Sequence, residues 1–295
     1  MDAADLRVFE SVARLGGMSR AASELNTVQS NVTARIRLLE GQLGAALFER
    51  HSRGVALTPA GRRLMPYALQ VITLLRDAKR AVADDGDPKG DLVIGSLETT
   101  ISMHLAPLLT GFVEKWPGVD LSIKGGTTCE SIDAVLDRRV EGAFVCGPVN
   151  HPELEEESIF REELVVLTSP SVTRLDWSAG LGGLRIVVLR AGCSYRQRLE
   201  DLLARRGVVG LRLLEFGTLE ALFGCVAAGL GITLLPRRMV EMVWRDRRVA
   251  IHALPPEEAM VETVFIRRRD AFVSSAQASF LDFVRHGMAQ VRAAE

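Results

Sequence analysis

Side chains able to read a pattern of hydrogen-bond donors and acceptors gather between residues 27 and 37, in the stretch TVQSNVTARIR. Its apolar members recur every fourth position, as on one face of a helix, and we expect that face to pack inward: Val28, Val32 and Ile36, followed by Leu39. The side chains left facing outward are Thr27, Gln29, Ser30, Thr33, Arg35 and Arg37. Glutamine can pair with adenine, serine and threonine with several bases, and arginine with guanine or phosphate. The pattern therefore fits base reading in DNA, although a solvated amphipathic helix explains it equally well.

The segments before this stretch predict two shorter helices. Leu6, Phe9 and Val12 form a helical stripe that ends at Gly16-Gly17. Ser19 is the expected N-cap of a second helix, and Thr27 the expected N-cap of a third that runs to about Leu43. Two helices joined by a tight turn, the second with polar residues near its start, are typical of a helix-turn-helix, in which the second helix enters the major groove.

A second group of candidate binding residues lies in turns further along the chain. Three hydroxyl-bearing or glycine turns precede expected helices: Ser96, Thr99 and Thr100; Thr127 and Thr128; Gly217 and Thr218. Helix N-termini carry unpaired N–H groups and positive potential, so turns of this kind can hold a carboxylate, while plain N-capping explains each one singly. Arg196 could likewise grip a ligand carboxylate, or pair with Glu200 one helical turn on. Cys193 fits a small packed residue better than a redox sensor.

The composition of the chain limits the classes of protein to which it can belong. The chain has 295 residues, 47% apolar and 25% charged, which suits two or three globular domains. The first residues, Met-Asp-Ala-Ala-Asp, do not resemble a signal peptide, so we expect a cytoplasmic protein without membrane contact and disregard the glycosylation sequon at Asn31. The four cysteines and five histidines show no metal-binding spacing, and no cofactor motif is present. Residues 1–67 contain nine Arg and six Asp or Glu, a net +3, against −1 for the whole chain, which weakly favours nucleic acid.

A long helix is predicted to follow the first 58 residues. Thr58-Pro59 makes a good helix start, and apolar residues then recur at heptad spacing: Leu64, Ala68, Val71, Leu75, Ala78 and Val82. Such a seam pairs with a partner helix or packs on its own domain. Pro66 falls inside it and is expected to bend the first turns. The charged, Gly- and Pro-containing segment 84–90 then predicts a hinge.

From Asp91 onward, short apolar runs alternate with helical stripes, which is typical of α/β domains. The expected strands are 92–94, 119–123, 142–146, 164–167, 185–189, 211–216, 232–235 and 261–266. Thr127 and Glu130 fit a capping box, and a last helix is expected over 273–288.

Several motifs of the first sixty residues resemble the N-terminal signature of LysR-type transcriptional regulators. They are Ala21-Ala22-x-x-Leu25, Gln29-Ser30-x-Val32-Thr33, Ile36-x-x-Leu39-Glu40, Leu43-Gly44-x-x-Leu47-Phe48-Glu49-Arg50 and Leu57-Thr58-x-Ala60-Gly61. The resemblance implies a winged helix-turn-helix over residues 1–58. It also implies a wing whose Arg50, His51 and Arg53 touch the DNA backbone. Ala34 stands where the family often has a basic residue, which puts one phosphate contact in doubt.

The body resembles the effector domain of the same family, most strongly through Phe216-Gly-Thr-x-Glu-Ala and Val226-Ala-Ala-Gly-x-Gly-Ile-x-x-Leu-Pro236. The resemblance implies a two-lobed α/β fold similar to type 2 periplasmic binding proteins, with a ligand cleft between the lobes. The implied parts are a linker helix over 59–83 that pairs subunits, the hinge at 84–90, lobe 1 over 91–162 and 267–295, and lobe 2 over 163–266. The chain would cross between the lobes near 160–163 and 264–267.

These observations lead to one functional expectation. The chain is expected to be a sequence-specific transcriptional regulator that binds double-stranded promoter DNA. A small, anionic metabolite in the cleft would modulate it, and it would assemble as a homodimer or homotetramer, with RNA polymerase as a further partner. No nucleophile elbow, zinc-protease motif or P-loop points to an enzyme. The alternative is a two-lobed α/β enzyme or solute-binding protein fused to a DNA-binding module.

Overall fold

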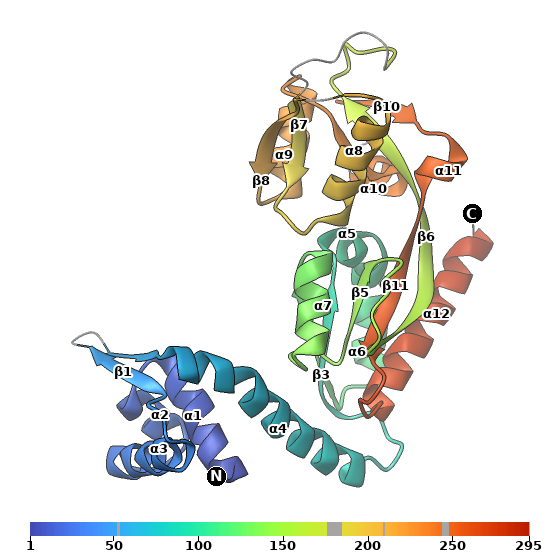
Figure 1. The fold of residues 1–295 in the computed structure, drawn as a ribbon. Helices are drawn as coiled ribbons and strands as arrows, with labels where there is room; N and C mark the ends of the chain where they lie inside the picture. Colours follow the sequence, from blue (N-terminus) through green and yellow to red (C-terminus); the bar gives the residue numbers. More distant parts are fainter. Residues whose placement is uncertain (52–53, 176–184, 209, 244–247, 295) are drawn as a thin grey trace. The chain divides into compact units, whose positions relative to one another are not determined.

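The computed structural model describes residues 1–51, 54–175, 185–208, 210–243 and 248–294. The chain forms two compact units, Met1–Asp85 and Gly86–Glu295, each considered by itself (Figure 1). The division falls inside the segment 84–90 that was predicted as a hinge. None of the described helices is long and apolar enough to cross a membrane.

The first unit is a winged helix-turn-helix followed by a long helix. Its elements are α1 (Ala3–Leu15), α2 (Met18–Glu24), α3 (Gln29–Leu43), β1 (Phe48–His51), β2 (Gly54–Leu57) and α4 (Pro59–Ala83). As predicted, α1 ends at the Gly16-Gly17 pair and α3 at Leu43. Gly16 and Gly44 cap the two helices with a left-handed backbone that glycine adopts without strain. The inner face of α3 buries Val32, Ile36 and Leu39 completely against α1 and α2.

The starts of α2 and α3 differ from the prediction. Gly17, not Ser19, is the N-cap of α2, and Val28, not Thr27, is the N-cap of α3. The Thr27 hydroxyl instead accepts a hydrogen bond from the Asn31 side chain at 2.9 Å. Because Val28 has an extended backbone outside the helix, its side chain is 65% exposed and does not pack inward as expected.

The wing is a hairpin of β1 and β2 that is joined to the helices by a backbone hydrogen bond. The Val55 N–H donates to the Gly16 carbonyl at 3.1 Å, which joins the wing to the turn after α1. Thr58 caps α4 by accepting from the Gly61 N–H at 3.0 Å. A Cβ at Gly61 would lie only 2.3 Å from the Leu47 carbonyl oxygen, so α4 approaches the chain before the wing as closely as a glycine permits.

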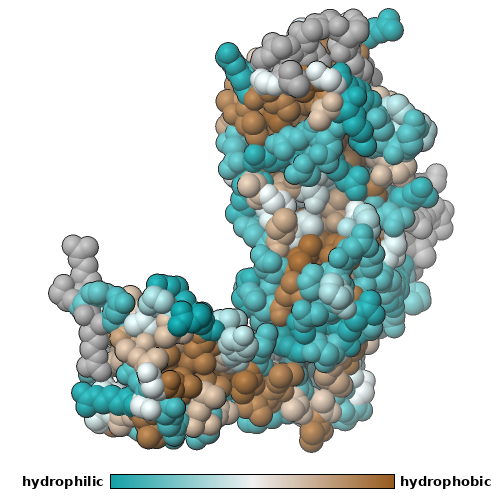
Figure 2. All heavy atoms as spheres, in the orientation of Figure 1, coloured by the Kyte–Doolittle hydropathy of each residue, from teal (hydrophilic) through white to brown (hydrophobic). Residues whose placement is uncertain are grey.

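The heptad seam of α4 is divided between two environments. Leu64 and Ala68 pack into the core of their own unit, so this part of the seam is not available to a partner helix. Val71 and Leu75 are 39% and 38% exposed, and Val82 is 90% exposed. Figure 2 shows the resulting hydrophobic surface along α4. Pro66 lies inside α4, which continues on both sides of it.

The second unit consists of two lobes that share one seven-stranded sheet, in the order β10-β6-β11-β5-β3-β4, with β9 also paired to β6. Lobe 1 contains β3 (Gly90–Ser96), α5 (Glu98–Thr100), η1 (Ile101–Leu105), α6 (Ala106–Lys115), β4 (Val119–Gly125), α7 (Thr128–Leu136), β5 (Gly142–Cys146) and α12 (Ser275–Ala294). Lobe 2 contains β7 (Arg185–Leu189), α8 (Ser194–Arg205), β8 (Arg212–Phe216), α9 (Leu219–Ala227), β9 (Thr233–Pro236), α10 (Arg237–Val243), β10 (Ala250–Ala253) and α11 (Pro256–Ala259).

Two strands run through both lobes, β6 (Leu154–Thr168) and β11 (Met260–Arg268) (Figure 1). The predicted strand 164–167 is therefore the end of a much longer one. β11 already pairs with β5 from Thr263 onward, and Val264 and Ile266 are buried in lobe 1. The second crossing thus lies before Thr263, and the predicted crossing at 264–267 was placed too late because those residues belong to the lobe 1 sheet.

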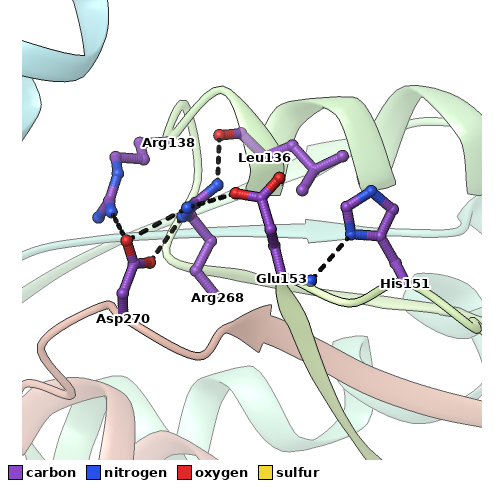
Figure 3. Close-up of polar contacts among 6 residues, drawn as sticks. All are labelled: Leu136, Arg138, His151, Glu153, Arg268 and Asp270. Carbon is purple, nitrogen blue, oxygen red and sulfur yellow. Dashed lines mark hydrogen bonds and ion pairs between the residues drawn. The ribbon is translucent and has the colours of Figure 1, made fainter.

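A cluster of ion pairs closes one end of lobe 1 (Figure 3). Arg138, which is only 7% exposed and has a left-handed backbone, donates to Asp270 at 2.6 Å. Arg268 donates to Asp270, to Glu153 and to the Leu136 carbonyl, so the end of α7 is joined to the ends of β11 and β6.

Candidate nucleic-acid interface and effector cleft

The outward face of α3 presents the polar side chains predicted from the sequence. Gln29 and Ser30 are exposed at the start of the helix, Thr33 is half-buried one turn on, and Arg37 is exposed. The Ser19 hydroxyl on α2 donates to Gln29 Oε1 at 2.9 Å. This contact occupies the amide oxygen of the exposed Gln29 and leaves its NH2 group as a donor.

Arg35 has a role within the domain that the sequence did not reveal. Its guanidinium donates to Asp5 Oδ1 at 2.8 Å, and Asp5 is only 4% exposed on α1. Asp2 lies 3.9 Å from the same nitrogen. Arg35 therefore anchors α3 to α1, and a contact with DNA would have to compete with a buried carboxylate.

The wing residues fall only in part within the described ranges. The backbone of Arg50 pairs with Val55 in the hairpin, and His51 lies 3.6 Å from Glu49. Arg53 lies outside the described residues.

In the second unit, a cleft lies where the two lobes meet, with about 460 Å³ of empty space that is partly open to solvent. Lobe 1 lines it with the starts of α5 and α7, and lobe 2 with the starts of α8 and α9. The lining residues are Leu97, Glu98, Thr99, Gly126, Thr127, Leu189, Arg190, Cys193, Ser194, Tyr195 and Gly217.

The structure brings together some of the predicted ligand residues. Thr99, Thr127 and Gly217 line the cleft, whereas Ser96 and Thr100 are fully buried beneath it. α5 begins at Glu98 and continues through the π-helical turn η1 into α6, so a helix does start directly after Ser96 and Leu97, as expected.

The remaining predicted residues make hydrogen bonds within the second unit. Thr128 is buried and accepts a hydrogen bond from Ser194 across the lobes at 2.7 Å. Thr218 is exposed and caps α9 by accepting from the Ala221 N–H. Thr127 and Glu130 form the predicted capping box of α7.

Arg196 is not among the residues that line this cleft. Its guanidinium donates to Glu200 at 3.0 Å and to Glu215 at 2.6 Å, so the predicted pairing one helical turn on is confirmed, and a ligand carboxylate would have to compete with both glutamates. Arg190 lines the cleft instead, and it lies 3.0 Å from Glu130 of lobe 1. The Thr127 N–H and then Arg190 lower the pKa of Glu130, which keeps this carboxylate charged.

Sequence reasoning missed a buried polar network beneath the cleft. Glu162, on the crossing strand β6, lies 2.7 Å from His104 Nε2 of lobe 1 and accepts a hydrogen bond from the Tyr195 hydroxyl of lobe 2 at 3.3 Å. The Tyr195 oxygen also lies 3.5 Å from the Thr99 hydroxyl. Burial, together with the charge of Glu162, raises the pKa of Tyr195 well above its ordinary value. Glu162 therefore links the two lobes through hydrogen-bonded partners.

The thiol of Cys193 behaves as expected of a packed residue. It lies at the N-cap of α8 beside the cleft, and burial raises its pKa. A raised pKa leaves little thiolate at neutral pH, so oxidation is disfavoured. Among the described residues, no group of three or more His, Cys, Asp or Glu side chains is placed to hold a metal ion.

Two family models together match most of the chain. The model described as "Bacterial regulatory helix-turn-helix protein, lysR family" matches residues 3–62, and the model described as "LysR substrate binding domain" matches residues 85–289.

Similar proteins span the same length. The HTH-type transcriptional regulator GltR of Bacillus subtilis is 41% identical over 280 residues, 95% of each chain. The regulator YofA of the same organism is 43% identical over 282 residues, 96% of this chain and 98% of its own. The structure of full-length CbnR complexed with its target DNA has the same fold, with a TM-score of 0.67 at 23% identity, and the match covers 97% of this chain and 99% of that one. These relatives are named for regulation or DNA binding, and not for catalysis.

Proposed function

This chain belongs to the LysR family of transcriptional regulators, and from that premise we propose a role for each of its two units. It is a DNA-binding transcriptional regulator with an effector-binding domain, and not an enzyme. In the proposal, the outer face of α3 reads operator bases through Gln29, Ser30 and Thr33, and Arg37 contacts phosphate. A small anionic metabolite then binds between the lobes and changes how the protein holds its DNA.

One observation carries the base-reading part of the proposal. On α3, the residues of one face are buried completely, and the side chains opposite are polar and exposed at the helix start. That arrangement suits a helix whose N-terminal residues meet base edges in the major groove. Arg50 and Arg53 remain proposed as contacts with the DNA backbone, and Thr27 and Arg35 as contacts with DNA. Arg35 would act there only after releasing Asp5.

The effector part of the proposal is supported by the chemistry of the cleft. Its lining combines the N-terminal turns of α7, α8 and α9 with hydroxyl groups and one guanidinium, which suits an anionic ligand. A ligand can shift DNA binding only if its affinity differs between two arrangements of the lobes.

Self-assembly is proposed through α4. Its second half carries the exposed side chains Val71, Leu74 and Leu75, which are spaced to meet the same residues of a second copy. A dimer, and from it a tetramer, would present paired recognition helices to a partly palindromic site in the promoter. Light scattering on the full chain gives the assembly directly. RNA polymerase is proposed as a partner at the promoter, and the cytoplasm as the place of action.

The experiment that tests this function is a footprint on the DNA immediately upstream of the protein's own gene, at physiological salt. We expect protection over several helical turns, at intervals of roughly 34 Å. Equal, weak binding to this DNA and to random DNA would contradict base reading at that site.

A further inference from the structure

The cleft contains a single cationic side chain among its described lining residues. That residue, Arg190, follows β7 in lobe 2, and its guanidinium lies 3.0 Å from Glu130 Oε2 of lobe 1. The side chains of both residues are about half exposed, at 51% and 54%. An ion pair this exposed contributes little to stability, so another carboxylate can displace it at small cost.

Glu130 is held at this position by its own helix and not by Arg190 alone. Its Oε2 accepts from the Thr127 N–H at 2.8 Å, as the second half of the capping box of α7. If a ligand took over the guanidinium, Glu130 would retain this hydrogen bond and its contact with water. Replacement of Glu130 by a ligand carboxylate at Arg190 therefore leaves neither the arginine nor the glutamate charge buried without a partner.

The turn that carries Arg190 is pressed against the start of α7. Gly192 has a left-handed backbone, with φ at 89°, and a Cβ there would lie 2.9 Å from the Thr127 hydroxyl oxygen. Two residues on, Ser194 donates to Thr128 at 2.7 Å. These contacts keep Arg190 and Glu130 facing each other, and the requirement for glycine at 192 follows from both the backbone angle and the lack of space.

The rest of the cleft indicates what accompanies an anionic group. Leu97, Leu189 and the Tyr195 ring supply apolar wall next to Arg190, which suits an apolar ligand body. Glu98, exposed on the lobe 1 side, is the anionic lining residue and would repel a second negative charge.

We propose that Arg190 is the anion-binding residue of the cleft and that Glu130 is a tethered competitor that lowers its affinity for ligands. The ligand class is a small monocarboxylate with an apolar body, whose carboxylate replaces that of Glu130 on the guanidinium. This inference rests on the proposed role of the cleft as the effector site. It also gives the ion pair between Arg190 and Glu130 a function, because binding the ligand would release one link between the lobes.

The test uses sodium hexanoate as the probe and the full chain as the protein. Saturable stabilisation by the probe is followed as a rise in the melting temperature, detected by tryptophan fluorescence at constant ionic strength. Glu130→Gln is the central variant, because its amide oxygen can still cap Thr127 while the negative charge is gone. We expect half-saturation at roughly threefold lower hexanoate in Glu130→Gln than in the natural protein. We expect no saturable response in Arg190→Gln.

Two matched probes sharpen the assignment. Adipate has the same number of carbons and a second carboxylate, so repulsion by Glu98 should make it bind more weakly than hexanoate. Hexanol lacks the charge and should give no saturable response. An Arg190→Gln variant that responds as the natural protein does, an unchanged affinity in Glu130→Gln, or no saturable response in Glu130→Gln would each overturn the proposal.

The result can be separated from that of the footprint. Operator protection without a hexanoate response leaves the regulator intact and removes this ligand assignment. A hexanoate response that depends on Arg190, without operator protection, keeps the binding site and removes the proposed role in DNA regulation.

Discussion

The outer face of α3 and the buried polar network beneath the cleft use polar side chains in opposite ways. On α3, Gln29, Ser30 and Arg37 are exposed, and Gln29 is held by Ser19. Beneath the cleft, Glu162, His104 and Tyr195 are each at most 6% exposed and are bonded to one another across two lobes. The outer face of α3 is accessible to a large partner, whereas the buried network holds the two lobes in position. Substitutions should therefore change binding in the first region and stability in the second.

The largest effect is expected from Glu162→Ala. Removing this carboxylate leaves His104 Nε2 and the Tyr195 hydroxyl without their buried partner, which should lower the free energy of unfolding of the effector unit by about 3 kcal/mol. Urea unfolding followed by tryptophan fluorescence measures this unit alone, because all three tryptophans, at 116, 177 and 244, follow residue 86. Glu153→Ala, near the start of the same strand but 55% exposed, is the control and should cost less than about 1 kcal/mol. Equal losses would show that the network does not join the lobes.

The next effect should appear in the DNA-binding unit alone. Gly61→Ala places a Cβ against the Leu47 carbonyl and the Leu57 side chain, and overpacking of this kind costs about 1–3 kcal/mol. Circular dichroism should show earlier unfolding of the helices of this unit, while the tryptophan transition is unchanged. Gly41→Ala in α3 is the matched control, since a Cβ at Gly41 would meet nothing within 4 Å and alanine favours helix. A shift of the tryptophan transition in Gly61→Ala would mean that the two units unfold together.

A smaller effect is expected from Tyr195→Phe, which removes one buried hydrogen bond and should cost about 1 kcal/mol at neutral pH. The raised pKa of Tyr195 in the folded protein adds a pH dependence. The unfolded tyrosine loses its proton near pH 10, so the natural protein should lose about 1.4 kcal/mol per pH unit from this group above that pH. Tyr195→Phe lacks this loss, so the difference in stability between the two proteins should narrow as the pH rises above 10. A constant difference in that range would contradict the burial of a neutral hydroxyl.

The difference between α3 and the buried network also explains which site residues could be predicted from the sequence. The outer face of α3 lies within one helix. The spacing of the apolar residues and the family motifs therefore predicted that Gln29, Ser30 and Thr33 would lie on the outside. The cleft network joins residues 99–104, 162 and 195, which no local pattern connects. Arg190 and Arg196 flank the same turn in the sequence, and only the fold shows that Arg196 also faces Glu215 while Arg190 lines the cleft.

The errors at helix starts have a common physical origin. Ser19 and Thr27 are good N-caps by residue type, but the backbone turns one or two residues away, at Gly17 and Val28. Gly17 and Val28 have the extended backbone of an N-cap, and the Thr27 hydroxyl accepts from the Asn31 side chain instead of capping the helix. The glycine helix ends and the capping box at Thr127 follow from local rules and were predicted correctly.

Base reading by Gln29 on α3, with Arg37 contributing charge, can be measured in one set of titrations. The affinities of the natural protein, Gln29→Ala and Arg37→Ala would be measured on the protected upstream sequence and on a scrambled duplex over a range of salt concentrations. We expect Gln29→Ala to lose about 1–3 kcal/mol of binding free energy on the protected sequence and little on the scrambled one. Arg37→Ala should lose equally on both and reduce the slope against salt by about one. An equal loss on both duplexes for Gln29→Ala would show that Gln29 does not read bases.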